Sequence, residues 1–298
     1  MKNNIKFMHD FYKNDRFIIK YFLRYFIRKN NFNKAKDKMP NFVIINNDYV
    51  SMDILIDGYY ELKELKVLFG WLKNKIKFNN VLDVGAYLGN HSVYFSNYFK
   101  GVVSFEPNPY SYDLLKINTK QKKNIKIYNF GLSNKNSTED FYNYEFNHGG
   151  SSVIKSKKTP YTKHRAKFYS FDKLNLKKKI DLIKIDVEGN ELNVLKGMKE
   201  TIQKSSPIIL FETQKKEIFN GTSAVINYLK SIEYNKFYSI ENYPNTKVTI
   251  FNKLAFYIKF IFFSRKKYIV ERDKFESKFY TFIIEEKNEY NYFLINDQ

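Results

Sequence analysis

Short apolar runs alternate with longer helical patterns through the middle of this chain of 298 residues. Strands separated by helices usually pair in parallel, and the helices then cover both faces of the sheet. The alternation therefore predicts an α/β fold around a mainly parallel sheet. The runs predicted as strands are 80–84, 102–105, 125–130, 180–185, 208–211 and 237–240.

Basic and aromatic sequence flanks this central region on both sides. Residues 1–45 are predicted to form a basic amphipathic extension, and residues 46–298 the main α/β domain. A second aromatic and basic stretch, at 241–278, is predicted as an insertion before the last strand. Neither stretch has the ~20 consecutive apolar residues of a membrane span, although either could lie on a membrane surface. The helical spacing in the extension comes from Phe7, Phe11, Ile18, Phe22 and Phe26.

The charge balance is strongly basic. The chain has 51 Lys and Arg against 31 Asp and Glu, which gives a net charge of +20 at pH 7. Such a charge favours contact with nucleic acid, an anionic membrane or an acidic glycan. A general drift of composition toward Lys, Asn, Ile, Phe and Tyr explains the same charge equally well. The charge alone therefore selects no partner.

Cysteine is absent from the sequence. This excludes disulfides, a thiolate nucleophile and cysteine-ligated metals. The N-terminal residues also lack the apolar core and cleavage site of a secretory signal. We expect a cytoplasmic protein, with peripheral contact to the inner face of a membrane as an open alternative.

A turn with two glycines follows the first predicted strand, in the segment NVLDVGAYLGNHS. Gly85 and Gly89 let the backbone approach a ligand closely, and the next helix offers free N–H groups to polar ligand atoms. Asp83 can accept a hydrogen bond from a ligand ammonium group or order the turn. The G-x-G-x-x-G pattern of dinucleotide binding is missing, which weighs against an oxidoreductase.

Carboxylates follow two later predicted strands. Glu106 comes ~20 residues after the glycine turn, the spacing at which an acid binds ribose hydroxyls. Asp186, Glu188 and Glu191 follow the apolar run DLIKI, at the edge where open α/β sheets bind ligands. These three acids could bind a divalent cation, but a fourth ligand is lacking and we predict no metal. Glu191 could instead complement a helix N-terminus.

Together these segments resemble the FkbM-type methyltransferase family, within the Rossmann-like enzymes that use S-adenosylmethionine. The resemblance covers residues 80–212 and rests on VLDVGAYLGNHS, FEPNP, NFGLSN, GGSS and IKIDVEGNELNVLKG. It implies a Rossmann-like methyltransferase fold, with a mainly parallel seven-stranded sheet, helices on both faces, and S-adenosylmethionine as cofactor. The cofactor-binding residues that it implies are Asp83, Gly85, Gly89 and Asn90 for the methionine part, Glu106 for the ribose, Asn108 in FEPNP, and Gly131 and Leu132 near the adenine.

His91 departs from the small or aliphatic residue expected in the family pattern. It is a candidate cofactor contact or a residue that only begins the helix.

Methyl transfer to a hydroxyl requires that the acceptor be positioned and that its proton be removed. The candidate catalytic residues are Asp186, Glu188 and His148, the last beside Gly149 and Gly150 in a predicted loop. The resemblance implies O-methylation, and we expect the acceptor to be a sugar, a glycan or another small molecule.

Two other classes of function stay open. A nucleic-acid methyltransferase would use Lys and Arg on phosphates and aromatic residues on bases. However, no cysteine can attack a pyrimidine, and DVEG rather than an N-P-P-Y-like turn follows the fourth strand, so we expect no specific nucleic acid. The other alternative is a catalytically idle Rossmann-like protein bound to a membrane or glycan. The oligomeric state is left open by the sequence.

Overall fold

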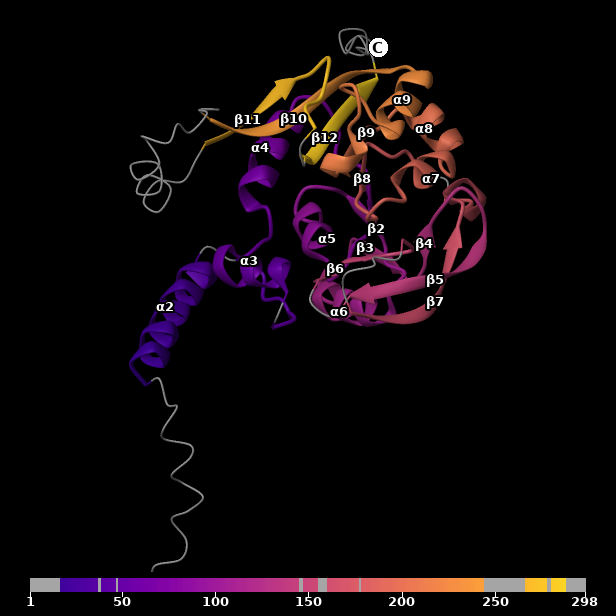
Figure 1. Cartoon of the computed structure of the whole chain (residues 1–298). Helices are drawn as coiled ribbons and strands as arrows, with labels where there is room; N and C mark the ends of the chain where they lie inside the picture. The colour runs from indigo at the N-terminus through magenta and orange to yellow at the C-terminus, as the bar shows by residue number, and fades with distance from the viewer. Residues whose placement is uncertain are drawn as a thin grey trace, which may run out of the picture.

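One large sheet with helices on both of its faces forms the body of the computed structural model (Figure 1). The structure describes residues 17–36, 39–46, 48–144, 147–154, 160–176, 178–243, 266–277 and 280–287. The strands of this sheet lie in the order β11-β10-β12-β9-β8-β1-β2-β3. Their bounds are β1 (Asn80–Val84), β2 (Gly101–Phe105), β3 (Ile125–Tyr128), β8 (Leu182–Ile185), β9 (Ile208–Thr213), β10 (Tyr234–Tyr243), β11 (Lys266–Glu271) and β12 (Tyr280–Lys287).

The sheet is mainly parallel, as predicted. β9, β8, β1, β2 and β3 pair in parallel with one another. β12 is antiparallel to both β9 and β10, so β10 runs in the same direction as the parallel strands. Val84 pairs with Phe105 on one side and with Ile185 on the other, so the carboxyl ends of β1, β2 and β8 lie at one edge.

The described part of the sheet has one strand more than the seven predicted. The additional strand, β11, falls within residues 241–278, which were predicted to be an insertion. It pairs antiparallel with the outer edge of β10, because the run from Tyr268 to Val270 has the aromatic and β-branched residues that favour a strand. Residues 244–265 of the predicted insertion lie outside the described residues.

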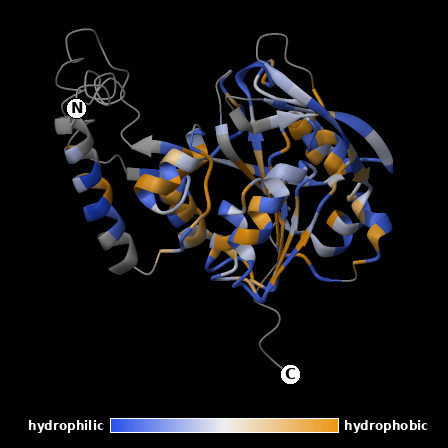
Figure 2. Cartoon of the chain, turned by 90° about the horizontal axis from the view of Figure 1, so that it is seen from below, coloured by the Kyte–Doolittle hydropathy of each residue, from blue (hydrophilic) through white to orange (hydrophobic). Residues whose placement is uncertain are grey.

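Helices cover the two faces of the sheet with separate apolar cores. One core joins α4 (Leu62–Leu72) and α5 (Asn90–Phe95) to side chains such as Val81 and Leu210. The other joins α7 (Glu191–Lys196), α8 (Lys199–Ser205) and α9 (Ala224–Ser231) to neighbours such as Leu82 and Phe211. Successive strand residues point to opposite faces, so strands buried on both sides are apolar throughout. Figure 2 shows this apolar interior between more polar outer surfaces.

A second, smaller sheet was not predicted. Its order is β4-β7-β5-β6, and it lies between β3 and β8 in the chain. Its strands are β4 (Gly131–Leu132), β5 (Ser137–Tyr144), β6 (Asn147–Ser152) and β7 (Tyr161–Tyr169), followed by the short 3-10 helix Phe171–Leu174. Phe141, Ala166 and Phe168 form its small core, whereas many other side chains in β5 and β7 are polar. Because of this polarity, the strands of the second sheet lack the apolar runs by which the other strands were predicted.

Two helices precede the main sheet. α2 (Phe17–Lys36) projects from the body, and α3 (Tyr49–Asp57) lies between α2 and the remaining fold (Figure 1). The Asn118 side chain exchanges hydrogen bonds with the backbone of Val43, which attaches this region to α6 (Pro109–Thr119). The predicted boundary at residue 45 stays a prediction. Within the described residues, none of the helices combines the length and apolar character that a bilayer crossing requires.

Two glycines offer a matched test of the packing. A Cβ added at Gly197 would lie 2.0 Å from the Ser133 carbonyl oxygen, whereas one added at Gly70 would have no heavy atom within 4 Å. We expect Gly197→Ala to lower the free energy of unfolding by about 1–3 kcal/mol through overpacking. Gly70→Ala, inside α4, should raise it by about 0.5–1 kcal/mol. Urea unfolding measures both, and an unchanged Gly197→Ala protein would contradict the close approach of residues 133 and 197.

Candidate active site

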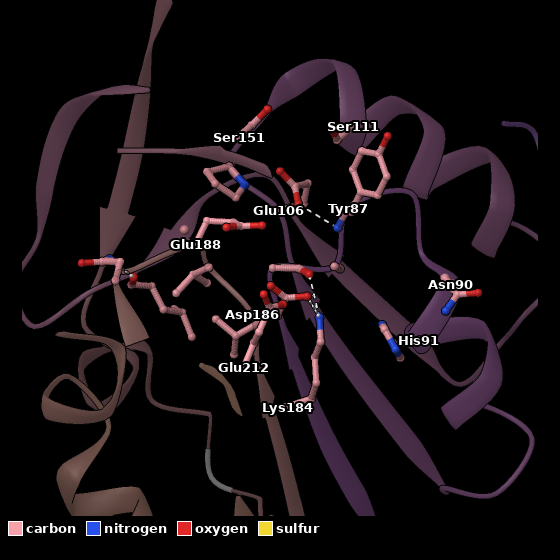
Figure 3. Close-up of a pocket in the computed structure, with 18 of the residues that line it drawn as sticks. Tyr87, Asn90, His91, Glu106, Ser111, Ser151, Lys184, Asp186, Glu188 and Glu212 are labelled. Carbon is pink, nitrogen blue, oxygen red and sulfur yellow. Dashed lines mark hydrogen bonds and ion pairs between the residues drawn. The ribbon is translucent and has the colours of Figure 1, made fainter. Parts of the chain in front are cut away.

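A cavity of about 360 Å³ opens where the carboxyl ends of β1, β2, β8 and β9 meet, a size typical of small-molecule sites. The second sheet also contributes to its wall. Of the residues predicted for the site, those that line it are Gly85, Asn90, His91, Glu106, Gly131, Leu132, Asp186 and Glu188. The sequence therefore located the cavity, and Figure 3 shows how several of these side chains converge on it.

The Gly85 turn joins three strand ends. The backbone N–H groups of Gly85 and Ala86 both donate to the Phe105 carbonyl, each at 3.0 Å. Gly85 has a φ of +81°, and a Cβ there would lie 1.8 Å from the Asp186 carbonyl oxygen. Only glycine satisfies both the left-handed backbone and this close approach. The turn is consequently fixed in place against the ends of β2 and β8.

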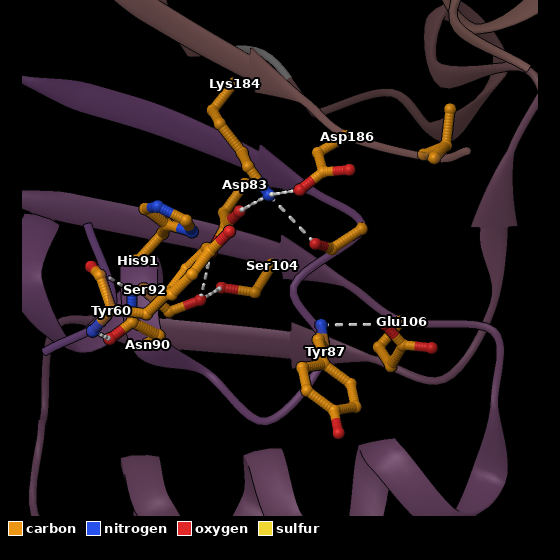
Figure 4. Close-up of polar contacts among 12 residues, drawn as sticks. Tyr60, Asp83, Tyr87, Asn90, His91, Ser92, Ser104, Glu106, Lys184 and Asp186 are labelled. Carbon is orange, nitrogen blue, oxygen red and sulfur yellow. Dashed lines mark hydrogen bonds and ion pairs between the residues drawn. The ribbon is translucent and has the colours of Figure 1, made fainter. Parts of the chain in front are cut away.

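Glu106 closes the other side of the turn. Its Oε2 accepts a hydrogen bond from the Tyr87 N–H at 2.8 Å (Figure 4). Its Oε1 accepts one from the Asn108 N–H at 2.8 Å. Burial raises the pKa of Glu106 to about 7, although these two hydrogen bonds and Lys184 oppose the shift. Each carboxylate oxygen has a further lone pair, so Glu106 can still accept hydrogen bonds from a ligand.

Three residues predicted to bind the cofactor do not line the cavity. Gly89 begins α5 in the left-handed region, with a φ of +94° and Leu115 packed against it. Asn108 is the N-cap of α6, and its side chain accepts from the Tyr110 N–H. Asp83 is fully buried behind the turn, where the Ser92 hydroxyl donates to its Oδ2 at 2.5 Å. In this structure all three support the walls of the cavity.

Lys184 is a residue of the cavity wall that the sequence analysis did not identify. Its ammonium lies 3.2 Å from Asp186 Oδ2, 3.5 Å from Asp83 Oδ1 and 3.1 Å from the Gly85 carbonyl oxygen (Figure 4). The residue is only 1% exposed. Burial by itself lowers the pKa of Lys184, but the carboxylates of Asp186 and Asp83 outweigh it and raise the pKa. A lysine inside the apolar run DLIKI was the available signal, because a buried charge requires partners.

Three carboxylates gather next to this lysine. Oxygens of Asp186, Glu188 and Glu212 all lie within 4.8 Å of one another. Burial together with Asp186 and Glu191 raises the pKa of Glu188 to about 7. Burial and the facing Asp186 and Glu188 raise the pKa of Glu212 far above its usual range, which favours its protonated form. The cluster can therefore both accept and donate protons.

The backbone at Glu188 is strained. Its φ is +53°, a value that non-glycine residues rarely adopt. Its Oε2 accepts a hydrogen bond from Gln214 Nε2 at 3.0 Å, which holds the carboxylate toward the cavity. Strain of this kind is concentrated at functional sites.

Glu191 is not part of the acidic cluster. Its Oε1 accepts from the backbone N–H groups of Val187 and Gly189, at 3.3 and 3.1 Å, so it orders the turn before α7. The cation site considered from the sequence, which used Glu191, is therefore not assembled. Glu212 joins the cluster instead, and we assign no metal to it.

The opposite wall includes Tyr60, which lies just before α4, and Asn90 and His91, which begin α5. The Asn90 side chain accepts from the Tyr60 N–H at 2.9 Å and donates to the Tyr60 carbonyl, so it positions Tyr60. His91 Nε2 lies 3.3 Å from Glu61 Oε2. Burial lowers the pKa of His91 to about 4, and burial raises that of Glu61 well above its usual value. Both shifts favour neutral groups, so this contact is a hydrogen bond rather than an ion pair.

The second sheet completes the cavity. Gly131 pairs with Phe168 in β4 and β7, and a Cβ at Gly131 would lie 2.3 Å from the Phe168 ring. Asn190 Nδ2 donates to the Leu132 carbonyl at 3.4 Å. The backbone of His148 belongs to β6, and its side chain lies outside the described part of the structure, so its catalytic role stays a prediction.

The residues present fit a nucleoside cofactor with a polar tail. Gly85 keeps the turn free of a side chain at the point where strand ends meet, and Glu106 presents carboxylate oxygens to the same cavity. Vicinal ribose hydroxyls are donors of the spacing that a carboxylate accepts. Gly85 and Glu106 line one cavity, as the binding of a single nucleoside by both residues requires.

Fold and site define a Rossmann-like protein of the methyltransferase class. Residues 83–237, slightly more than half of the chain, match the methyltransferase FkbM domain. The chain belongs to this family, as its sequence motifs predicted.

Several known proteins are similar to the chain. Hexuronic acid methyltransferase AglP of Haloferax volcanii is 30% identical over 132 residues, which are 43% of this chain and 53% of that protein. The chain thus spans about half the length of this curated relative. The FkbM methyltransferase structure from Methylobacillus flagellatus has 18% identity and a TM-score of 0.40, covering 63% of this chain and 48% of that one. A Streptococcus mutans protein in complex with SAH has 11% identity and a TM-score of 0.39, covering 75% and 97%.

Replacing Lys184 tests whether its charge holds the site together. Lys184→Met leaves the buried Asp83 carboxylate without its cationic partner, so the free energy of unfolding should fall by about 3–5 kcal/mol. Lys196→Met, at an exposed position of α7, should change it by less than about 0.5 kcal/mol. Urea unfolding of both variants provides the comparison. If Lys184→Met and Lys196→Met had the same free energy of unfolding, the ion pairs of Lys184 would not stabilise the fold.

Proposed function

We propose that the chain is an S-adenosylmethionine-dependent O-methyltransferase that acts on a hydroxyl of a sugar, a glycan or another small molecule. The observation that carries this proposal is one shared cavity. The Gly85 turn and Glu106 line the same space as Asp186 and Glu188. Membership of the FkbM family supports the cofactor, and the carboxylates support transfer to a hydroxyl.

Bound S-adenosylmethionine supplies a methyl group on a positively charged sulfur. Glu106 would accept hydrogen bonds from the ribose, and the Gly85 turn would lie against the amino-acid part. Leu132 and the flanking wall of the second sheet would cover the base. With the cofactor held in this way, the remaining cavity beside Asp186 and Glu188 is left for the acceptor.

Glu188 has the properties of a general base. A base works best when its pKa is close to the working pH, and the pKa of Glu188 is raised to about 7. Asp186 has a different role in the proposed reaction. Its Oδ2 is fixed by Lys184 at 3.2 Å, so Asp186 can orient the acceptor hydroxyl while Glu188 takes the proton.

An acidic sugar is a reasonable acceptor to test. The relative from Haloferax volcanii is described as a hexuronic acid methyltransferase, and the net charge of +20 favours an anionic glycan. The acidic cluster would repel a sugar carboxylate placed against it. We therefore expect a hydroxyl, and not the carboxylate, to face Asp186 and Glu188.

The pH dependence of turnover tests the role of Glu188. Methyl transfer from labelled S-adenosylmethionine to an oligosaccharide ending in hexuronic acid should increase as the pH rises through about 7, because Glu188 then loses its proton. With both substrates saturating, Glu188→Gln should lower turnover by about 100-fold or more and remove this rise.

Glu200→Gln, an exposed carboxylate of α8, serves as the matched control and should keep the wild-type profile. The methyl group on the product should resist mild alkali, as an ether does. Label released by alkali would mean an ester on the sugar carboxylate. A Glu188→Gln enzyme with the wild-type rate would remove Glu188 as the base.

A further inference from the structure

The outer face of α2 carries a continuous group of exposed aromatic residues. Tyr21, Phe22, Tyr25 and Phe26 are spaced so that they share one side of the helix, and each is more than half exposed. Phe26 reaches 61% exposure. Scattered apolar residues on a surface are ordinary, but a cluster of this kind marks a site of interaction.

Basic side chains accompany this aromatic face. Arg24, Arg28 and Lys29 are exposed on α2, and the helix has no Asp or Glu in its sequence. A helix with aromatic residues on one face and basic residues beside them has the composition of an interfacial membrane helix. Anionic lipid headgroups complement this charge, whereas a purely apolar partner would not.

The position of α2 leaves this face accessible. Asn30 Nδ2 donates to the carbonyls of Leu55 and Ile56, at 3.3 and 2.5 Å, which attaches α2 to α3. The helix projects from the body of the protein beyond this attachment (Figure 1). Through this attachment to α3, a surface bound by α2 would also orient the domain.

Exposed apolar side chains continue onto α3. Tyr49, Met52 and Ile56 recur with helical spacing, and Tyr49 is 71% exposed. Tyr49 also lines the cavity. Because α3 contains Asp53 and Asp57, which anionic lipids would repel, the main lipid contact belongs to α2 and α3 forms its flank.

We propose that α2 docks the protein on an anionic lipid bilayer, lying parallel to the surface with Phe22 and Phe26 inserted among the headgroups. Arg24, Arg28 and Lys29 bind the lipid phosphates. Tyr49 of α3 lines the cavity, so docking through the neighbouring α2 also holds the cavity near the membrane. The inference does not depend on methyl transfer, since its test measures binding to lipid alone.

Sedimentation with vesicles tests the docking surface. The full chain should bind vesicles of phosphatidylcholine mixed with phosphatidylglycerol, should bind pure phosphatidylcholine much more weakly, and should be released by high salt. Arg24→Gln/Arg28→Gln should lower the partition coefficient by roughly 25-fold, or fivefold per charge removed. Phe22→Ser/Phe26→Ser should lower it by about tenfold or more.

The matched control is Phe219→Ser, which removes an aromatic residue that is 76% exposed elsewhere on the surface. This variant should bind as the wild type does. Thermal unfolding should be the same for all variants, since each altered side chain is exposed. Failure of the wild type to bind phosphatidylglycerol vesicles, or an equal loss in the control, would overturn the proposal. So would a dimer, detected by sedimentation velocity without vesicle binding, that Phe22→Ser/Phe26→Ser dissociates.

Discussion

A single buried ammonium joins the two halves of the site. Lys184 lies on β8 and contacts Asp83 on β1, the Gly85 turn and Asp186 at the end of its own strand. The desolvation of a lone lysine in this position would be costly, and the carboxylates offset it. The position of the Gly85 turn and the orientation of the Asp186 carboxylate are therefore set by the same interaction.

The other residues of the site lie at the ends of neighbouring strands. β1 and β2 supply the glycine turn and Glu106, while β8 and β9 supply Asp186 and Glu212. Parallel pairing makes this possible, because it brings carboxyl ends from distant parts of the sequence to one edge. Burial raises the pKa values of Glu188 and Glu212, and the repulsion between neighbouring carboxylates raises them further.

Much of the site could be predicted because its geometry follows from strand order. Gly85, Glu106 and Asp186 each come at the end of an apolar run, so parallel pairing places them together whatever lies between. Asp83 belongs to the strand itself, and the alternation of side chains turns it behind the cavity. Its contacts with Ser92 and Lys184 could be identified only from the packed structure.

Other parts depended on contacts that no local pattern encodes. Tyr60 enters the cavity wall because Asn90 holds its backbone across 30 residues of sequence, and the next residue, Glu61, contacts His91. The strands of the second sheet bury few side chains, so their pattern lacks the apolar alternation that identifies a core strand. The residues of β11 were predicted to be part of an insertion and not a strand. The Lys and Glu residues at its two ends are typical of an exposed segment.

The proposed function requires that Glu106 and the Gly85 turn hold one nucleoside cofactor. Titration calorimetry with S-adenosylhomocysteine measures this directly in the wild type and in Glu106→Gln, which keeps the shape of the side chain but removes its charge. We predict tight binding to the wild type, an affinity about 10–100-fold lower in the variant, and no binding of NAD to either. Equal affinity in the two proteins, or binding of NAD alone, would contradict the account.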